Sequence, residues 1–480
     1  MPAICQVFEQ QESIGRTGAG RRPATEAHGR AGIARLAFLA RGQDEAQRRS
    51  RTAWPPCEQT KARRGALGQA VARRAGSGTH GRANARRPVL GVLVCRRNPK
   101  KLPADAPAAG GPSAGTPPAE APRVEAPFAE ADFIRRLQEA GGRIGLEVIA
   151  FDPLMADAAS RTIHGWRWDA GEGAWRGAAR PLPALLYDRA WPEGDAERRR
   201  FRAALHRLLD GDDPPRLLNA PLPGKTAVHA ALSRHPAIRR HLPPTVPYTG
   251  MDSLRGRLDE WDGAVFLKPD GGWQGRGILA LRRKSGGLLE LAGRTTRNVP
   301  FRLAGREEVI LALVHRRMGA RSYLMQPYLE LVTPGGAPFD LRLLVQKNTI
   351  GRWTLTGAAV RLGRPDGVTA NLHGGGTPLS PEDALARWFG EDAARELMSK
   401  ARRLAAVIVR QLESSFGRFA ELGLDFGIDR SGALWFLEAN GKPGRTAARR
   451  AGRRADALSH LRPLMYARSI LLRHSREGHP

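Results

Sequence analysis

The sequence predicts an α/β protein of mixed α+β character, with a small N-terminal domain, a larger second domain and a basic extension in front of both. Apolar runs typical of buried strands alternate with helical repeats from residue 88 onward. The 480 residues, of which 41% are hydrophobic, are enough for two or three domains with cores of their own. Residues 1–87 lack a sustained hydrophobic period and hold 17 Lys and Arg against 6 Asp and Glu, which predicts disorder.

Three interpretations of residues 1–87 stay open. The segment can be a basic tail for an anionic partner, an organellar transit peptide, or translated sequence upstream of the true start. We favour the last, because the first recognisable element begins at Pro88.

The net charge of +30 comes mostly from arginine. It fits biased genomic composition as well as an anionic partner, and nucleic-acid binding is the weaker idea because no recognition motif or interleaved aromatic residues accompany the arginines. Cys5, Cys57 and Cys95 show neither a pairing pattern nor metal-ligand spacing, which favours a reducing compartment. No apolar run approaches the roughly 18 to 20 residues of a membrane span. We expect a cytoplasmic protein without a membrane partner.

The first domain is predicted at residues 88–220. Residues 89–95 (VLGVLVC) are a buried-strand run, and residues 128–140 have helical spacing ended by two glycines. Between them, the Pro/Ala/Gly-rich stretch 99–127 predicts a flexible loop. The other expected elements are strands at 144–151, 185–188 and 216–219, a helix at 195–209, and a hairpin at 164–176 whose tryptophans we assign to core packing.

A second domain is predicted at residues 221–472, with a short tail at 473–480. It opens with Gly224-Lys225-Thr226 at a helix start, which resembles the end of a P-loop but lacks its first glycine, so Lys225 alone predicts only a solvated helix start. A strand at 263–269 then carries Lys268 near its end. The loop after it, 271–277, contains Gln274 and the glycines Gly271, Gly272, Gly275 and Gly277.

These glycines let the backbone approach a ligand closely and point several N–H groups at phosphate oxygens. The order strand, glycine loop, strand is that of a flap that covers phosphates. A plain hairpin turn is the alternative, but seven residues exceed what a tight turn needs. We therefore predict phosphate binding by Lys268 and the loop 271–277.

Strands at 322–328, 339–346 and 353–362 and a long helix at 391–416 complete the predicted scaffold. Asp340 and Arg342 are two residues apart and share one face of their strand. The loop 370–376 offers Asn371 and His373 beside three glycines, and we interpret His373 as an ordinary loop residue.

The strongest chemical pattern is the segment 422–444, LGLDFGIDRSGALWFLEANGKPG. Two apolar runs around Ser431-Gly432 predict a hairpin, and Glu438 and Asn440 then share a strand face. Asp425 would lie across from that pair, so that three oxygen ligands converge as magnesium prefers. A solvated hairpin with scattered polar residues is the alternative, which a carboxylate within an apolar run makes less favourable.

The order of these motifs resembles the ATP-grasp superfamily from Pro88 to about Leu472, and the Glu-x-Asn-x-x-Pro-Gly string at 438–444 matches its metal signature. The start GVLV, the LYDRAW segment, the FLKPDGGWQGRG flap and the ending RPLMYARSIL look like the YheC/YheD family. That resemblance implies an N-terminal α/β domain before two α+β subdomains that sandwich ATP.

The resemblance also implies roles for individual residues. Lys225, Lys268 and the flap would hold the ATP phosphates, Gln326, Pro327 and Tyr328 would meet the adenine, and Asp340 would accept from ribose hydroxyls. Asp340 is the least secure of these, because the segment between Gln326 and Asp340 is longer than in compact relatives. Arg361 and Asn371 would face the reacting phosphoryl and acyl groups. Asp425, Glu438 and Asn440 would hold magnesium or manganese.

The implied activity is a carboxylate–amine ligase that uses ATP and magnesium and forms an acyl phosphate, with the carboxylate substrate and the amine nucleophile undefined. The resemblance further implies a link to the endospore coat or cell envelope, with spore-coat proteins as partners. The alternative is a structural protein of the spore coat that keeps the nucleotide site but has no ligase activity.

Overall fold

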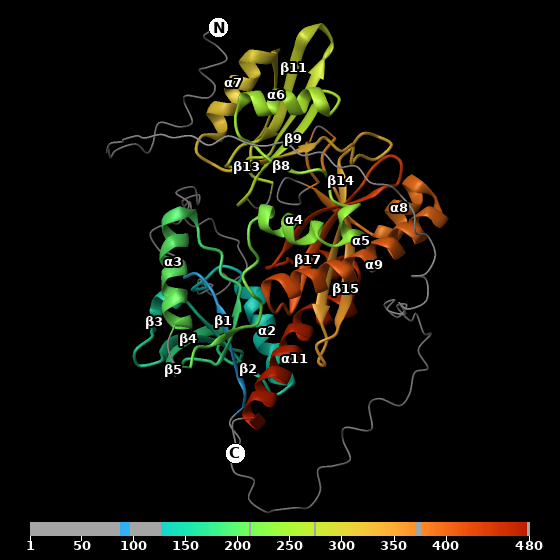
Figure 1. Ribbon diagram of the computed structural model, residues 1–480. Coiled ribbons are helices and arrows are strands. Elements are labelled where there is room, and N and C mark those ends of the chain that lie inside the picture. The colour runs from blue at the N-terminus through green and yellow to red at the C-terminus, as the bar shows by residue number, and fades with distance from the viewer. Residues whose placement is uncertain are drawn as a thin grey trace, which may run out of the picture. The chain divides into compact units, whose positions relative to one another are not determined.

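The computed structural model describes residues 87–96, 126–210, 213–272, 275–365, 367–370 and 376–477. The predicted extension 1–87 except its last residue, most of the predicted loop 99–127, and the candidate residues Gln274 and Asn371 lie outside these ranges. The described strands form three sheets, seen in Figure 1 with the helices that pack on them. No helix in these ranges is long and apolar enough to cross a membrane.

The first sheet has the strand order β3-β4-β2-β1-β6-β7, with β5 paired to β4. Its central strands are parallel, as expected for the predicted α/β domain, and the predicted tryptophan hairpin is present as β4 and β5. Trp166 is buried in this hairpin. The elements are β1 (Val89–Leu93), α2 (Ala131–Arg143), β2 (Glu147–Phe151), β3 (Ala156–Asp157), β4 (Thr162–Asp169), β5 (Ala174–Pro181), β6 (Leu185–Asp188), α3 (Gly194–Leu209) and β7 (Arg216–Leu217).

The second sheet has the order β12-β11-β10-β9-β13-β8 and is antiparallel throughout. The glycine loop connects β9 and β10, and α6 and α7 pack on one side of the sheet (Figure 1). The elements are β8 (Val246–Pro247), α6 (Met251–Glu260), β9 (Ala264–Pro269), β10 (Leu279–Lys284), β11 (Leu288–Arg294), β12 (Pro300–Arg306), α7 (Glu307–Met318) and β13 (Tyr323–Pro327).

The third sheet has the order β16-β15-β14-β17-β18 and is also antiparallel. The apolar face of the predicted long helix, α9, packs against it with Leu404, Ile408 and Leu412. Its elements are α4 (Lys225–Ser233), α5 (Pro236–Arg239), β14 (Phe339–Lys347), β15 (Trp353–Leu362), β16 (Thr377–Leu379), α8 (Pro381–Phe389), α9 (Glu391–Phe416), β17 (Glu421–Ile428), β18 (Leu434–Asn440), α10 (Thr446–Arg450) and α11 (Arg453–Glu477).

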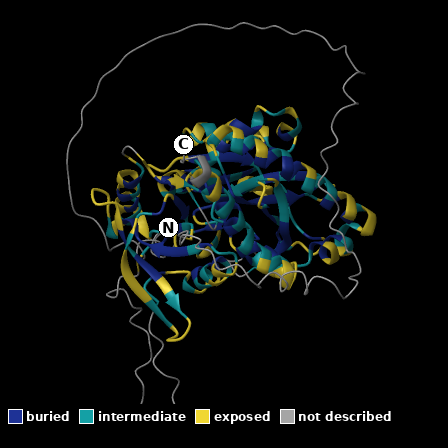
Figure 2. Cartoon of the chain, turned by 90° about the horizontal axis from the view of Figure 1, so that it is seen from below, coloured by how far each residue is buried: buried dark blue, intermediate teal, exposed yellow. Residues whose placement is uncertain are grey.

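The last helix, α11, completes the core of the first domain. Leu464, Ala467 and Ile470 pack in one cluster with residues of β1, β2 and α2. The helix runs to Glu477, beyond the predicted domain end at residue 472. Figure 2 shows the buried residues gathered along the sheets, with exposed residues on loops and outer helix faces. The predicted boundaries at 88, 220 and 472 remain predictions, and α11 joins the two domains they separate.

Gly357 on β15 provides the first testable prediction. A Cβ added there would lie 2.7 Å from the Ala448 Cα and 2.9 Å from the Ala447 carbonyl oxygen, both backbone atoms of α10. We expect Gly357→Ala to lower the free energy of unfolding by about 1–3 kcal/mol, because the helix must move away from the sheet. Chemical denaturation measures this, with Gly256→Ala as the control, since its Cβ would meet no atom within 4 Å. Equal stability of the two variants would contradict the prediction.

Candidate functional site

The predicted hairpin is formed by β17 and β18, and it places Asp425 directly opposite Glu438. The Asn440 Nδ2 atom lies 3.4 Å from Asp425 Oδ2 and 3.4 Å from Glu438 Oε1. A shift in register between Asp425 and Phe426 bends the strands at this point. The structure therefore brings together the three side chains that the sequence singled out.

Two arginines hold Asp425. Arg342 donates two hydrogen bonds to its carboxylate, one of them 2.7 Å long at Oδ2, and Arg361 Nη2 lies 2.9 Å from the same oxygen. Burial raises the pKa of Asp425, but the two guanidinium groups lower it by more, so that its pKa lies well below the usual range. Arg342 was expected on the same strand face as Asp340, but the sequence predicted no role for it.

Asp340 shares Arg361 with Asp425. Arg361 Nε and Nη2 donate to the two Asp340 oxygens at 2.5 Å and 2.7 Å, and both residues are buried. Burial raises the pKa of Asp340, and the ion pair with Arg361 opposes that shift. Because both carboxylate oxygens accept from Arg361, the predicted contact of Asp340 with a ribose would have to compete with this pair.

The hairpin fits a divalent cation at its Glu438 end. Among the described residues, the Glu438 carboxylate accepts only from Asn440, so its remaining oxygen positions are uncommitted. Magnesium is commonly held by one or two carboxylates together with substrate phosphates and water. No group of three or more His, Cys, Asp and Glu side chains able to hold a metal occurs in the described ranges. The chain therefore fits an ion that arrives with a phosphate ligand better than a closed metal cage.

Two lysines lie beside this hairpin. Lys225, the first residue of α4, donates to the Gly272 carbonyl oxygen at 2.7 Å, which ties the helix to the glycine loop. Lys268, on β9, reaches β18 and donates to the Leu437 carbonyl oxygen at 3.4 Å. Desolvation lowers the pKa of Lys268 to about 8, with Lys225 acting in the same direction and the nearby Glu438 and Asp270 carboxylates opposing it.

A cavity of 160 Å³ opens between the second and third sheets, and most of the predicted nucleotide-site residues line it. Its apolar wall includes Phe266, Ile278, Leu329 and Leu437. The predicted residues among its lining are Lys225, Lys268, Gly272, Gly275, Gln326, Pro327, Tyr328, Asp340, Arg361, Asp425 and Glu438.

The remaining predicted site residues are not among those that line the first cavity. Gly271 and Asn440 line a second cavity next to the first, and Gly277 faces Tyr323, whose hydroxyl donates to the Gly277 carbonyl oxygen at 2.9 Å. Gln274 and Asn371 lie outside the described residues. Tyr328 lines the first cavity, and the guanidinium of Arg282 lies 3.8 Å from the centre of its ring, so Tyr328 already has a cationic neighbour on one side.

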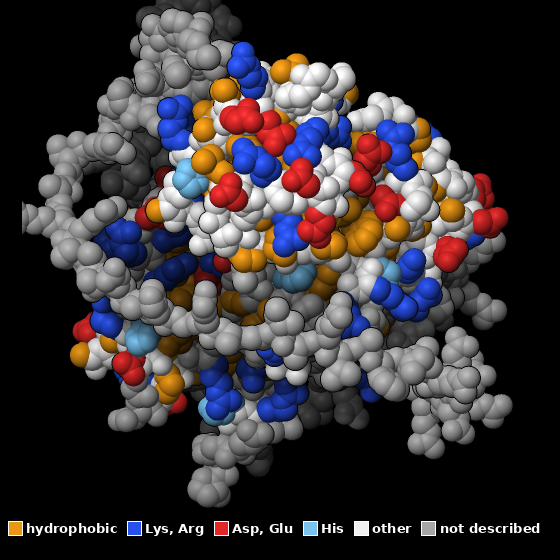
Figure 3. Space-filling view, turned by 45° about the horizontal axis from the view of Figure 1, so that its top comes forward, with side chains coloured by type: hydrophobic (Ala, Val, Ile, Leu, Met, Phe, Trp, Pro, Cys, Tyr) orange, Lys and Arg blue, Asp and Glu red, His pale blue; other side chains and the backbone are white. Residues whose placement is uncertain are grey.

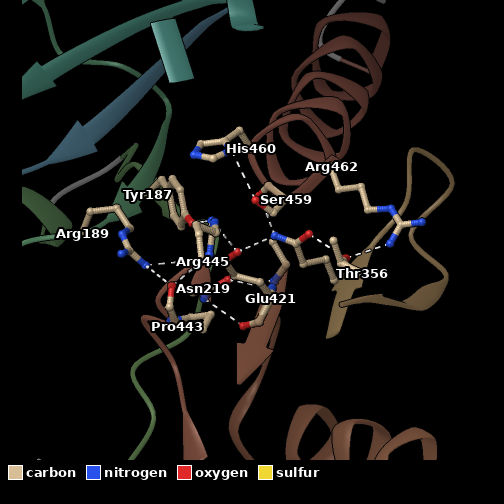
Figure 4. A network of polar contacts seen from close by, with 12 residues as sticks. Tyr187, Arg189, Asn219, Thr356, Glu421, Pro443, Arg445, Ser459, His460 and Arg462 are labelled. Atoms are coloured by element: carbon tan, nitrogen blue, oxygen red, sulfur yellow. Dashed lines mark hydrogen bonds and ion pairs between the residues drawn. The ribbon is translucent and has the colours of Figure 1, made fainter. Parts of the chain in front are cut away.

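A buried polar network lies behind the hairpin and connects it to the first domain (Figure 4). Glu421, fully buried at the start of β17, accepts from the Tyr187 hydroxyl and from Gln346 Nε2 at 2.7 Å. Arg445 Nη2 lies 2.8 Å from its carboxylate and Arg189 Nη1 lies 3.6 Å away. Arg189 also pairs with Glu130, whose Oε2 atom lies 3.3 Å from Arg189 Nη2, so the two arginines face two carboxylates. None of these contacts was predicted from the sequence.

Asn219 fixes the ends of the two hairpin strands. Its amide donates to the carbonyl oxygens of Glu421 at 3.1 Å and Gly441 at 2.8 Å, and its Oδ1 atom accepts from the Ala420 N–H at 2.7 Å. Lys442, two residues after Asn440, donates to Asp188 Oδ1 and the Ala190 carbonyl oxygen, both at 2.7 Å. The loop after the predicted metal ligands is therefore held by the first domain.

Comparison with known proteins identifies the family. A sequence model described as "YheC/D like ATP-grasp" matches residues 215–470. The chain is 24% identical over 352 residues to the endospore coat-associated protein YheC of Bacillus subtilis (strain 168), covering 72% of this chain and 94% of YheC. It is 29% identical over 321 residues to the endospore coat-associated protein YheD of the same organism, covering 63% of this chain and 68% of YheD.

The chain also superposes on solved structures of two synthetases. D-cycloserine synthetase DcsG superposes with a TM-score of 0.46 at 14% identity, covering 80% of this chain and 99% of that one. D-alanyl-alanine synthetase A from Vibrio cholerae gives a TM-score of 0.42 at 11% identity, with the same coverage. Because the family match extends over more than half of the sequence, this chain belongs to the YheC/D-like ATP-grasp family.

Proposed function

We propose that the protein is an ATP- and magnesium-dependent ligase that joins a carboxylate to an amine. The observation that carries the proposal is the convergence of Lys225, Lys268 and the Asp425–Glu438 hairpin on one cavity, beneath a glycine loop. Cations on one side and oxygen ligands on the other are what a metal-bound triphosphate requires.

In this proposal Lys225 and Lys268 bind the phosphates as point charges, and the backbone of the glycine loop covers them. Gln326, Pro327 and Tyr328 line the adenine end, where Gln326 is fixed by a 2.7 Å hydrogen bond from its Nε2 atom to Thr245 Oγ1. Glu438 and Asn440, with Asp425 beside them, would hold magnesium or manganese, which supplies charge neutralisation at the γ-phosphoryl group.

The reaction has two steps. A substrate carboxylate oxygen attacks the γ-phosphorus, the bond from the β–γ bridging oxygen to that phosphorus breaks, and ADP leaves behind an acyl phosphate. An amine nitrogen then attacks the acyl carbon, the bond from that carbon to the phosphate oxygen breaks, and the amine proton passes to phosphate or solvent. Arg361 and Asn371 are proposed to face the reacting groups, where positioned cations and donors stabilise the developing charge.

Release of ADP and phosphate on addition of a carboxylate tests this proposal, and hydroxylamine can stand in for the unknown amine because it converts acyl phosphates to hydroxamates. We expect hydroxamate to form only when ATP, magnesium and a carboxylate are all present. Tight ATP binding without turnover across a broad carboxylate panel would overturn it.

A second candidate is a nucleotide-binding structural protein without ligase activity. The observation that favours it is the engagement of both Asp425 oxygens by Arg342 and Arg361, with which a metal at Asp425 would have to compete. A role at the endospore coat, with coat proteins as partners, is proposed for either function because the relatives YheC and YheD are endospore coat-associated proteins. The face seen in Figure 3 carries interspersed acidic and basic side chains, which gives no support for nucleic-acid binding there.

The pKa of Lys268 predicts how nucleotide binding depends on pH. Phosphates stabilise the charged amine, so ATP binding raises this pKa from about 8 and takes up a proton. ATP affinity should therefore be highest below pH 8 and fall about tenfold for each further pH unit above it, until the pKa of the bound state is reached. Calorimetric titration from pH 7 to 9.5 measures this.

The matched variant is Lys268→Arg, which stays charged over the whole range. Its affinity is expected to change little with pH, whatever its absolute value. If the ATP affinity of Lys268→Arg falls with pH as steeply as that of the wild type, a group other than Lys268 titrates.

A further inference from the structure

The second cavity has a volume of 660 Å³ and lies beside the nucleotide cavity. Both cavities are lined by Lys225, Lys268 and Glu438, so they meet where the proposed γ-phosphate would react. From there the second cavity reaches the first domain, at α3 and the segment that precedes it. If the proposed function holds, its occupant at the shared end is the reacting carboxylate.

The distal part of this cavity is apolar and aromatic. Trp191, Phe201, Leu205 and Leu217 contribute to its wall. Trp191 is 40% exposed, and the Lys442 ammonium lies 5.7 Å from the centre of its ring. Sites of roughly 300–1,000 Å³ with mostly apolar walls bury drug-sized ligands, so this cavity suits an occupant with an apolar body larger than a free amino acid.

Within the described part of the chain, one cation at the distal end of the cavity forms no ion pair. Lys442 is held by Asp188 at 2.7 Å, and Arg198 pairs with Asp195 at 2.6 Å. Arg202, one helical turn after Arg198 on α3, also lines the cavity, and no carboxylate of the described residues lies within ion-pair distance of it. A guanidinium in this position can bind a carboxylate of the occupant through two parallel hydrogen bonds.

We propose that the carboxylate substrate is peptide-like, with its reacting carboxyl group at Glu438 and Lys268, an apolar middle part against Trp191 and Phe201, and a distal acidic group on Arg202. This inference rests on the proposed ligase function. It adds the class of substrate, which the motif residues of the nucleotide site do not specify.

The test compares three probes: acetyl-Asp-Leu-Ala, the matched neutral peptide acetyl-Asn-Leu-Ala, and free alanine. Hydroxamate formation with ATP, magnesium and hydroxylamine gives kcat and KM for the full chain. We expect a KM for acetyl-Asp-Leu-Ala about tenfold below that for acetyl-Asn-Leu-Ala, and turnover of free alanine at least tenfold poorer than that of either peptide.

Arg202→Gln should raise the KM about tenfold for the acidic peptide alone, with kcat unchanged, and so remove the preference. Arg207→Gln, an exposed arginine of the same helix that does not line the cavity, is the matched control and should change neither value. Trp191→Ala should raise the KM for both peptides. Equal effects of Arg202→Gln on the two peptides, or alanine turnover equal to that of the peptides, would overturn the substrate class and leave the ligase function standing.

A binding measurement separates the two proposals. Calorimetry with the full chain and a non-hydrolysable ATP analogue records peptide affinity without turnover. Arg202-dependent binding of acetyl-Asp-Leu-Ala with no hydroxamate from any carboxylate would support the site and overturn the ligase. Absence of peptide binding in a protein that binds the analogue would overturn the substrate class.

Discussion

Replacing Glu438 with Gln is expected to lower magnesium-dependent ATP turnover by about two to three orders of magnitude while leaving the fold intact. Glu438 is the member of the hairpin cluster whose carboxylate is bound by no arginine in the described structure, so it is the residue best able to hold a metal–phosphate group. The amide keeps the size of the side chain but removes the negative charge, and single groups that stabilise transition-state charge contribute factors of about 10² to 10³.

ADP release as a function of magnesium concentration measures the effect, and thermal unfolding checks the fold. Glu396→Gln is the matched control, since Glu396 is an exposed residue of α9 outside both cavities. Turnover equal to wild type in Glu438→Gln would refute the assignment of the metal site. Lost turnover together with a large drop in melting temperature would instead point to a structural role for Glu438.

Glu421→Ala is expected to destabilise the protein by about 3–5 kcal/mol. The carboxylate is fully buried and is the shared partner of Arg445 and Arg189. Its removal leaves the buried Arg445 guanidinium without this counter-charge and leaves Arg189 with Glu130 alone, at 3.3 Å. The hydrogen bonds from Tyr187 and Gln346 also lose their acceptor. Urea unfolding monitored by circular dichroism measures the change.

Glu308→Ala, at an exposed site on α7, is the control and should change stability by less than about 0.5 kcal/mol. Glu421→Gln should fall between the two, because the amide oxygen still accepts hydrogen bonds while the charge is lost. A stability of Glu421→Ala within the range of the control would show that water or movement of the arginines compensates for the missing carboxylate.

Local patterns in the sequence predicted the parts of this protein that depend on neighbouring residues. The β17–β18 hairpin, the position of Lys225 at the start of α4, and the strand ending in Lys268 all follow from periodicity and turn residues within a few positions. The same holds for the long helix at 391–416. These are the elements from which the candidate nucleotide site is built.

The unpredicted parts depend on contacts between distant segments. Arg342 and Asp425 are 83 positions apart, and Tyr187 and Glu421 are 234 apart, so no local spacing relates them. The docking of α11 on β1 and α2 is hidden for the same reason. Strands β11 and β12 and helix α7 were also not predicted. The strand β12 begins with a proline and contains a glycine and two arginines, which is a weak strand signal.

The network around Glu421 includes residues that lie outside the segment matched by the family model. The family match begins at residue 215, but Tyr187 and Arg189 lie before that point and their side chains surround Glu421. A protein trimmed to the matched segment would open the Glu421 carboxylate to solvent on one side and expose the face of α11 that covers β1 and α2. The matched family segment therefore lacks the residues of β1, α2 and β6 that bury Glu421 and one face of α11 in this protein.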